Sequence, residues 1–314
     1  MSTATDANTI APDAGARSET AIRPTRPFYW SVRRELWEHR SIWIAPLAAA
    51  GLVLFGFLIR LVRLPHVLIT VNGLPPMKQS LAYASPFAGA AAAILVVGLI
   101  VAVFYCLGSL GGERRDRSIL FWKSLPASDL TTVLAKAFVP LLIVPVVIFA
   151  VTIATQIIML LIGSVVLAAN GMNVSAIWTH WPMAKMTVAF AYLVAVITLW
   201  YAPLYGWFMM VSAWARKMAI LWAVLPPIGL SIVEHIAFDT SWVGDLINYR
   251  VGGFVEEAFA SLPNRHHIVI QTIDPYALLA PEKFLSTPGL WVGLLFAVAF
   301  FAAAVYLRRG REPA

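Results

Sequence analysis

Six long apolar runs, separated by shorter polar stretches, constrain this chain more than any other feature of its sequence. They lie at about 42–60, 86–110, 134–168, 186–211, 218–237 and 289–307, and a helix needs ~20 apolar residues to cross a bilayer. Only 12% of the 314 residues are charged, against about 25% in soluble domains. Because backbone polar groups in lipid must be satisfied within the segment, the runs predict an all-α integral membrane protein with six transmembrane helices.

The third run is longer than a ~30 Å hydrocarbon core requires, at about 1.5 Å of rise per residue. Pro140 and Pro145 lie near its start. Proline removes a backbone donor and clashes with the preceding turn, so these residues predict either a kink or a cytoplasmic extension of the helix.

The segment before the first run divides into two parts. Residues 1–26 are small and polar and predict a disordered cytoplasmic tail, because they cannot bury enough apolar surface to order. Residues 27–41 predict an amphipathic helix in the membrane interface, with Arg33 and Arg40 beside its aromatic side chains. The alternative is a frayed extension of the first span. One arc of this helix holds Phe28, Tyr29, Trp30, Val32, Leu36 and Trp37, and the opposite arc holds Ser31, Arg34, Glu35 and Glu38.

The distribution of positive charge predicts the orientation. With the N-terminus in the cytoplasm, 16 of the 23 Lys and Arg residues fall on the inner side and 7 on the outer side. The seven are Arg60, Arg63, Lys78, Lys185, Arg250, Arg265 and Lys283. Both termini, including the tail 311–314, are then cytoplasmic in a bacterial-type inner membrane. Residues 238–288 become an outer segment with short helices broken at Gly252-Gly253. The net charge of +7 thus indicates a lipid bilayer as partner, and no nucleic acid.

The cytoplasmic loop 111–130 combines two kinds of residue. Its charged half is Glu113, Arg114, Arg115, Asp116 and Arg117, and its apolar half is Ile119, Leu120, Phe121 and Trp122. A short helix that presses the apolar half into a groove on another protein would satisfy both halves. Positive-inside charge with an aromatic anchor in the lipid headgroups explains the pattern equally well.

The stretch "ERRDRSILFWKSLPASDLTTVLAK" resembles the loop that follows the second span in ABC type-2 exporter permeases. Glu113, Arg114, Leu120, Leu125, Pro126, Ser128 and Lys136 fall at matching positions, and Arg117-Ser118 stands where the family has Gly-Thr. With the interfacial helix, the six spans and the topology, the resemblance covers residues 27–310. It implies that residues 113–122 form a coupling helix that docks on a separate ATPase subunit. It also implies a second permease copy, with ATP and Mg bound by the ATPase.

The sequence also lacks the motifs expected of an ATPase or of an ion-driven transporter, which is consistent with this resemblance. It contains no Gly-Lys pair, and therefore no phosphate-binding loop of the G-x-x-x-x-G-K type. No Asp or Glu occurs between Leu130 and Val233, which disfavours a proton- or sodium-driven transporter. No spacing of His or Cys suggests a metal site, and no catalytic residues are expected. The alternative to an exporter subunit is a non-transporting scaffold or signalling subunit that holds a cytoplasmic partner. The transported substrate stays open.

Two groups within the spans are candidates for the substrate pathway. Gly89, Ala93, Gly98 and Ala102 form rows of small residues in the second span, which allow close helix contact. They predict either a pathway or dimer face, as the resemblance implies, or packing within one protomer. Glu234 and His235 near the outer end of the fifth span could line a substrate exit, or could reach headgroups and water.

Overall fold

The computed structural model describes residues 27–72, 75–111, 128–215, 217–260 and 275–309. These residues are helical nearly throughout, and they contain no strand beyond one isolated bridge between Phe259 and Leu279. Six of the described helical segments are long and apolar enough to cross a membrane. The all-helical fold class and the six helices of membrane-spanning length and composition expected from the sequence are therefore confirmed. The two predicted tails, 1–26 and 311–314, lie outside the described residues.

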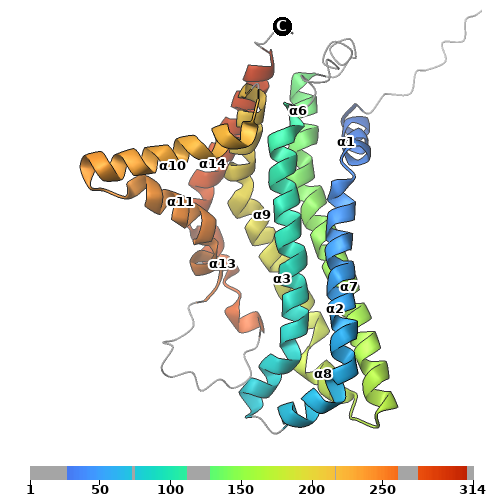
Figure 1. The fold of residues 1–314 in the computed structure, drawn as a ribbon. Coiled ribbons are helices and arrows are strands. Elements are labelled where there is room, and N and C mark those ends of the chain that lie inside the picture. Colours follow the sequence, from blue (N-terminus) through green and yellow to red (C-terminus); the bar gives the residue numbers. More distant parts are fainter. Residues whose placement is uncertain (1–26, 73–74, 112–127, 216, 261–274, 310–314) are drawn as a thin grey trace, which may run out of the picture.

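The helices form a bundle with a laterally projecting arm (Figure 1). The bundle contains α1 (Pro27–Glu38), α2 (Ser41–Asn72), α3 (Pro76–Ser109), α6 (Asp129–Phe138), α7 (Val144–Ala169), α8 (Ser175–His180), α9 (Met183–Trp214) and α14 (Pro288–Arg309). The arm contains α10 (Ala219–Phe238), α11 (Trp242–Gly252), α12 (Phe254–Ala258), η2 (Pro275–Leu278) and α13 (Pro281–Ser286).

Small residues bring the bundle helices close together. A Cβ atom at Gly206 of α9 would lie 3.2 Å from the carbonyl oxygen of Ala297 and 3.1 Å from Phe300 Cβ, both in α14. A Cβ atom at Gly98 of α3 would collide with the side chain of Ile148 in α7. Glycine therefore permits the close approach that van der Waals packing between membrane helices needs.

The third span is one continuous helical segment, Asp129–Ala169, that changes its winding once. Residues Val139–Ile143 form a π-helical turn, η1, that contains Pro140 and separates α6 from α7. The sequence predicts a kink or an extension here, and the structure has both an irregular turn and an additional helix, α6, on the loop side.

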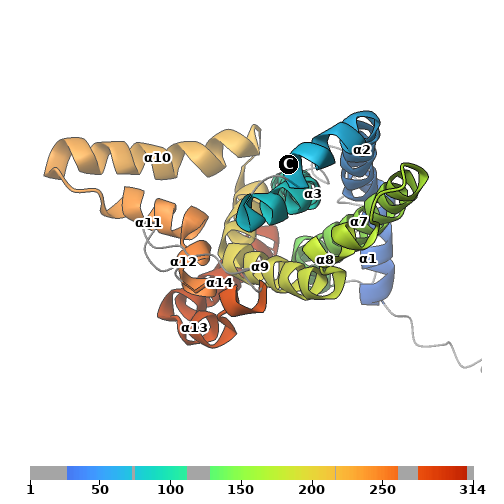
Figure 2. The same ribbon diagram turned by 90° about the horizontal axis from the view of Figure 1, so that it is seen from below.

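The arm has a direction that the apolar runs do not predict. α10 has the length and composition of a span, but it projects away from the bundle, across the bundle axis (Figures 1 and 2). Ala223 is its one buried side chain among the described residues. The described part of the segment 238–288, which the sequence predicts as an outer segment, runs back along α11 and α12 and reaches α9 and α14 at mid-height of the bundle. The predicted break at Gly252-Gly253 is present, because α11 ends at Gly252 and α12 begins at Phe254.

Candidate functional site

The predicted coupling residues lie outside the described residues, whereas both flanks of their loop are described. Glu113, Arg114, Arg115, Asp116, Arg117, Ile119, Leu120, Phe121 and Trp122 belong to this undescribed segment. The described chain stops at Gly111, just after α3, and resumes at Ser128, just before α6. The structure therefore shows how the two ends of the loop are held.

A buried polar cluster joins three helices at this end of the bundle. Lys136 of α6 donates a hydrogen bond from Nζ to Oε1 of Glu35 in α1 over 2.7 Å. The Tyr105 hydroxyl of α3 donates to Oε2 of the same carboxylate over 2.9 Å. Glu35, Lys136 and Tyr105 are 3%, 2% and 5% exposed. Each carboxylate oxygen therefore has a donor, which is the condition under which a buried charge is tolerated.

α1, which carries Glu35, has the orientation and the exposed aromatic side chains expected of an interfacial helix. α1 lies across the bundle axis at the end of α2 (Figures 1 and 2). Its aromatic side chains Trp30 and Trp37 are 57% and 70% exposed, and the Arg33 guanidinium lies 5.3 Å from each ring centroid. This agrees with the predicted amphipathic helix and with Arg33 beside the aromatics.

Glu35 itself departs from the expected pattern. It belongs to the arc that sequence reasoning treats as the polar face, yet it is the buried residue of α1. The reason is that Glu35 meets Lys136 of α6 and Tyr105 of α3, so its carboxylate faces protein instead of water. A signal was present in the sequence, because Lys136 falls inside the apolar run 134–168 and an intramembrane Lys requires a partner.

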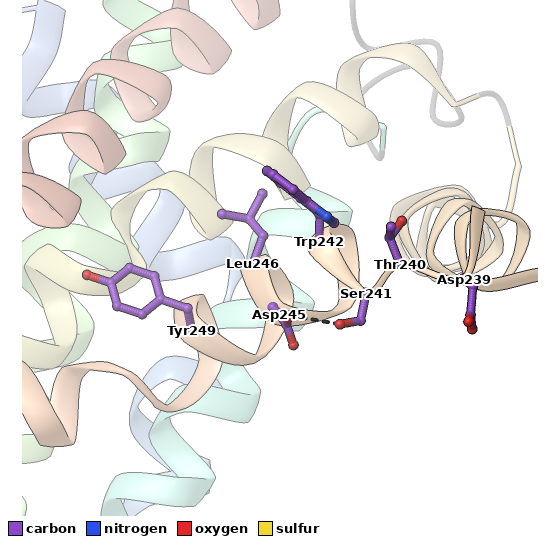
Figure 3. Close-up of a pocket in the computed structure, with 7 residues that line it drawn as sticks. All are labelled: Asp239, Thr240, Ser241, Trp242, Asp245, Leu246 and Tyr249. Atoms are coloured by element: carbon purple, nitrogen blue, oxygen red, sulfur yellow. Dashed lines mark hydrogen bonds between the residues drawn. The ribbon is translucent and has the colours of Figure 1, made fainter.

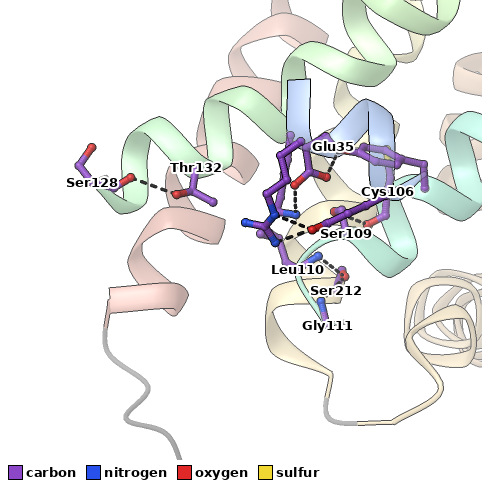
Figure 4. Close-up of polar contacts among 12 residues, drawn as sticks. Glu35, Cys106, Ser109, Leu110, Gly111, Ser128, Thr132 and Ser212 are labelled. Atoms are coloured by element: carbon purple, nitrogen blue, oxygen red, sulfur yellow. Dashed lines mark hydrogen bonds and ion pairs between the residues drawn. The ribbon is translucent and has the colours of Figure 1, made fainter. Parts of the chain in front are cut away.

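The C-terminal end of α3, just before the loop, is fixed by the hydroxyl group of a serine in α9. The backbone N–H groups of Leu110 and Gly111 both donate to Ser212 Oγ of α9, over 3.3 and 3.1 Å (Figure 4). Ser212 is fully buried, and Ser109 donates to the carbonyl oxygen of Cys106 one turn back. The last residues before the loop are thus fixed to α9.

The N-terminal end of α6, just after the loop, is also fixed by polar contacts. Ser128 caps α6, since its Oγ accepts a hydrogen bond from the backbone N–H of Thr131 over 3.1 Å. Arg308, near the C-terminal end of α14, donates from Nε to Oδ1 of Asp129 over 2.9 Å. Asp129 in the first turn also complements the positive N-terminal end of the helix dipole. Both ends of the loop are therefore tied to other helices through polar contacts.

The predicted small-residue rows divide into two environments. Gly98 and Ala102 are buried within the chain, and Gly98 packs against Ile148. Gly89 is exposed, and a Cβ atom there would meet nothing within 4 Å, while Ala93 is partly exposed. Gly98 and Ala102 thus serve packing within one protomer, and only Gly89 and Ala93 are accessible to a second copy.

The Glu234 carboxylate is held by the turn that follows α10. The Glu234 carboxylate accepts hydrogen bonds from the Thr240 hydroxyl and from the backbone N–H groups of Trp242 and Val243, over 2.8 to 2.9 Å. It therefore caps the start of α11 and fixes the turn from α10, while the His235 side chain is exposed. This capping role is the simplest account of a carboxylate at this position.

The charge distribution predicts Arg250 to be one of the outer-side charges, but its guanidinium lies between helices. Nη1 donates to the carbonyl oxygen of Trp200 in α9 over 3.3 Å, and Nη2 donates to that of Gly289 in α14 over 3.0 Å. The guanidinium carbon lies 4.7 Å from the Trp200 ring centroid, and Trp200 Nε1 donates to the Arg250 carbonyl oxygen over 2.9 Å.

A glycine pair in α14 makes room for this arrangement. A Cβ atom at Gly293 would collide with the Arg250 guanidinium, and one at Gly289 would collide with the Tyr249 hydroxyl. The spacing Gly-x-x-x-Gly, which usually allows two helices to approach, here accepts two side chains of α11. The Tyr249 hydroxyl also contacts Glu257 over 3.4 Å.

A shallow hollow of about 610 Å³ is lined by the turn that follows α10 and by α11 (Figure 3). Trp242, Leu246 and Tyr249 line its α11 side, and Asp239 and Asp245 are among its polar residues. Asp245 accepts a hydrogen bond from Ser241 over 2.9 Å. Among the described residues no group of three or more His, Cys, Asp or Glu side chains could hold a metal ion.

Together these features define the class of the protein: an all-helical, multi-pass integral membrane protein with a polar-braced loop at one end of its bundle. No model of a protein family matches the chain, and neither a curated protein nor a solved structure matches it significantly.

Proposed function

We propose that this chain is the permease subunit of an ATP-driven ABC exporter, coupled through residues 113–122 to a separate ATPase subunit. Two permease copies form the substrate pathway. ATP and Mg bind in the ATPase, and this chain supplies no catalytic residue. The observation that carries the proposal is the buried Glu35, Lys136 and Tyr105 cluster, which braces both flanks of the loop against α1.

A loop that transmits motion from a partner needs ends that move as a unit with the spans. The end of α3 is bonded to α9 through Ser212, and the start of α6 to α14 through Asp129 and Arg308. A displacement of the loop would therefore act on four helices at once, because contiguous hydrogen bonds and packed helices carry mechanical coupling. A loop that only anchored in headgroups would have no need of such bracing.

The positive charges at the loop end of the bundle support an inner-membrane orientation with both termini in the cytoplasm. α1, the start of α6 and the C-terminal end of α14 lie at one end of the bundle (Figure 1). Arg33, Arg34, Arg308 and Arg309 are at this end, and the loop contributes Arg114, Arg115 and Arg117. Positive charge concentrates on the cytoplasmic side of membrane proteins, so this end faces the cytoplasm and the ATPase.

The experiment removes the proposed anchors. Phe121→Ala with Trp122→Ala should reduce co-purification of the ATPase, or uncouple ATP hydrolysis from transport, while the permease still inserts. Buried aromatic anchors at interfaces commonly contribute ~2 kcal/mol or more, so the affinity should fall about 30-fold. The matched control is Trp37→Ala, an exposed interfacial tryptophan of α1. The measurement is ATPase pull-down together with substrate flux in liposomes.

Three outcomes separate the alternatives. Normal assembly and flux in the double variant would refute docking through the apolar half of the loop. Equal defects in the double variant and in Trp37→Ala would favour headgroup anchoring. A wild-type complex that retains its cytoplasmic partner but shows no ATP-dependent flux would favour a scaffold or signalling subunit.

A further inference from the structure

Arg250, in α11, contacts the bundle helices α9 and α14 far from the ends that lie beside the loop. Its contact Trp200 lies ~21 Å before the end of α9 at Trp214, and its neighbour Gly293 lies ~24 Å before the end of α14 at Arg309, at about 1.5 Å per residue. If these helix ends mark the inner interface, Arg250 lies in the outer half of a ~30 Å hydrocarbon core. A cation at this depth is costly and usually marks a pathway for substrates or ions.

The described part of the chain offers this cation no carboxylate within ion-pairing distance. Its partners are two backbone carbonyl oxygens and the face of Trp200. Glu257, an acidic residue nearby in the chain, accepts hydrogen bonds from Tyr249 and Thr287. The guanidinium has five N–H donors, of which two are used, and it is only half-buried. Positive charge and donors thus remain available to an anion.

We propose that Arg250 is an anion-binding residue that takes the phosphate or carboxylate group of an amphiphilic ligand within the membrane. The forked donors of arginine match both groups, and the neutral, low-dielectric surroundings strengthen the attraction. The apolar tail of such a ligand would lie along the uncovered apolar surface of α10, where Ile232 and Val233 are 53% and 59% exposed. As a statement about the transported substrate this rests on the proposed exporter function, whereas binding itself does not.

The test uses the purified full-length permease alone, in an uncharged maltoside detergent. Binding of dodecyl phosphate is measured by calorimetric titration, with dodecyl phosphocholine as the zwitterionic probe and inorganic phosphate as the probe without a tail. Wild type should bind dodecyl phosphate in preference to both. Arg250→Gln should weaken this binding roughly 10- to 100-fold, as loss of a charge-assisted contact predicts, and Arg250→Lys should weaken it less.

Arg60→Gln is the matched control, because it removes an exposed arginine at a helix surface and should leave binding unchanged. Unaltered affinity in folded Arg250→Gln would overturn the proposal, as would equal loss in Arg60→Gln. If Arg250→Gln fails to fold, wild-type specificity decides, since equal binding of the phosphate and phosphocholine probes overturns the proposal. Equal affinity for inorganic phosphate would overturn the amphiphilic part.

The outcome is separable from that of the exporter proposal. Arg250-dependent binding without ATP-dependent flux would retain the anion site and reject the exporter. ATP-dependent flux with binding that does not depend on Arg250 would retain the exporter and reject the anion site.

Discussion

Lys136 and Arg250 are both cations placed among the helices, yet the chain treats them differently. Lys136 is 2% exposed and meets a carboxylate at 2.7 Å, and a tyrosine hydroxyl occupies the other oxygen of that carboxylate. Arg250 is half-buried and meets two carbonyl dipoles and an indole face. The first charge is neutralised within the chain and can only brace the helices. The second is stabilised without being neutralised, so its field remains available to a ligand.

The largest effect is expected at the neutralised pair. Glu35→Ala leaves Lys136 buried without its carboxylate and should destabilise the protein by about 3–5 kcal/mol. Thermal unfolding in detergent, together with steric-trapping measurements, would report the loss. The control is Glu35→Leu with Lys136→Met, which removes both charges and should recover most of the stability. If the stability of Glu35→Ala equalled that of the wild type, the contrast between Lys136 and Arg250 would fail, because Lys136 would then need no counter-charge.

An intermediate effect is expected where α14 accepts Arg250. Gly293→Ala places a methyl group against the guanidinium and should destabilise the protein by about 1–3 kcal/mol through overpacking. Gly56→Ala in α2 is the control, because a Cβ atom there would meet nothing within 4 Å. That change should be neutral, or stabilising by up to ~1 kcal/mol, since alanine is the better helix former. Equal unfolding temperatures for the two variants would contradict the placement of Arg250 against Gly293.

The smallest effect is expected one turn from Glu35, on the water-facing side of α1. Arg34 Nε lies 2.6 Å from Glu38 Oε1, about the separation found in the buried pair, but these side chains are 24% and 43% exposed. Glu38→Gln should therefore cost only about 0.3–0.5 kcal/mol, and added salt should reduce even that difference. A loss as large as that of Glu35→Ala would show that distance, and not burial, decides what an ion pair contributes here.

The sequence by itself determined the elements whose causes are local. Six apolar runs with few charges require six helices in lipid, and periodicity identified the aromatic arc of α1 before any contact was known. The break after Gly252 and the irregular turn at Pro140 follow from the backbone preferences of glycine and proline at those positions. Each of these features depends on residues within one helix or one turn of the chain.

The tertiary structure alone decided what each helix face meets. A helical wheel groups Glu35 with Arg34 and Glu38, but it cannot show that a lysine 101 positions later covers only Glu35. Likewise Arg250 looks like an ordinary loop charge until α14 brings the Gly289 and Gly293 groove beside it. The direction of α10 belongs here as well, because a helix that is apolar on all sides carries no pattern that selects a neighbour. Pairings over such separations depend on how helices pack, and packing is a property of the whole chain.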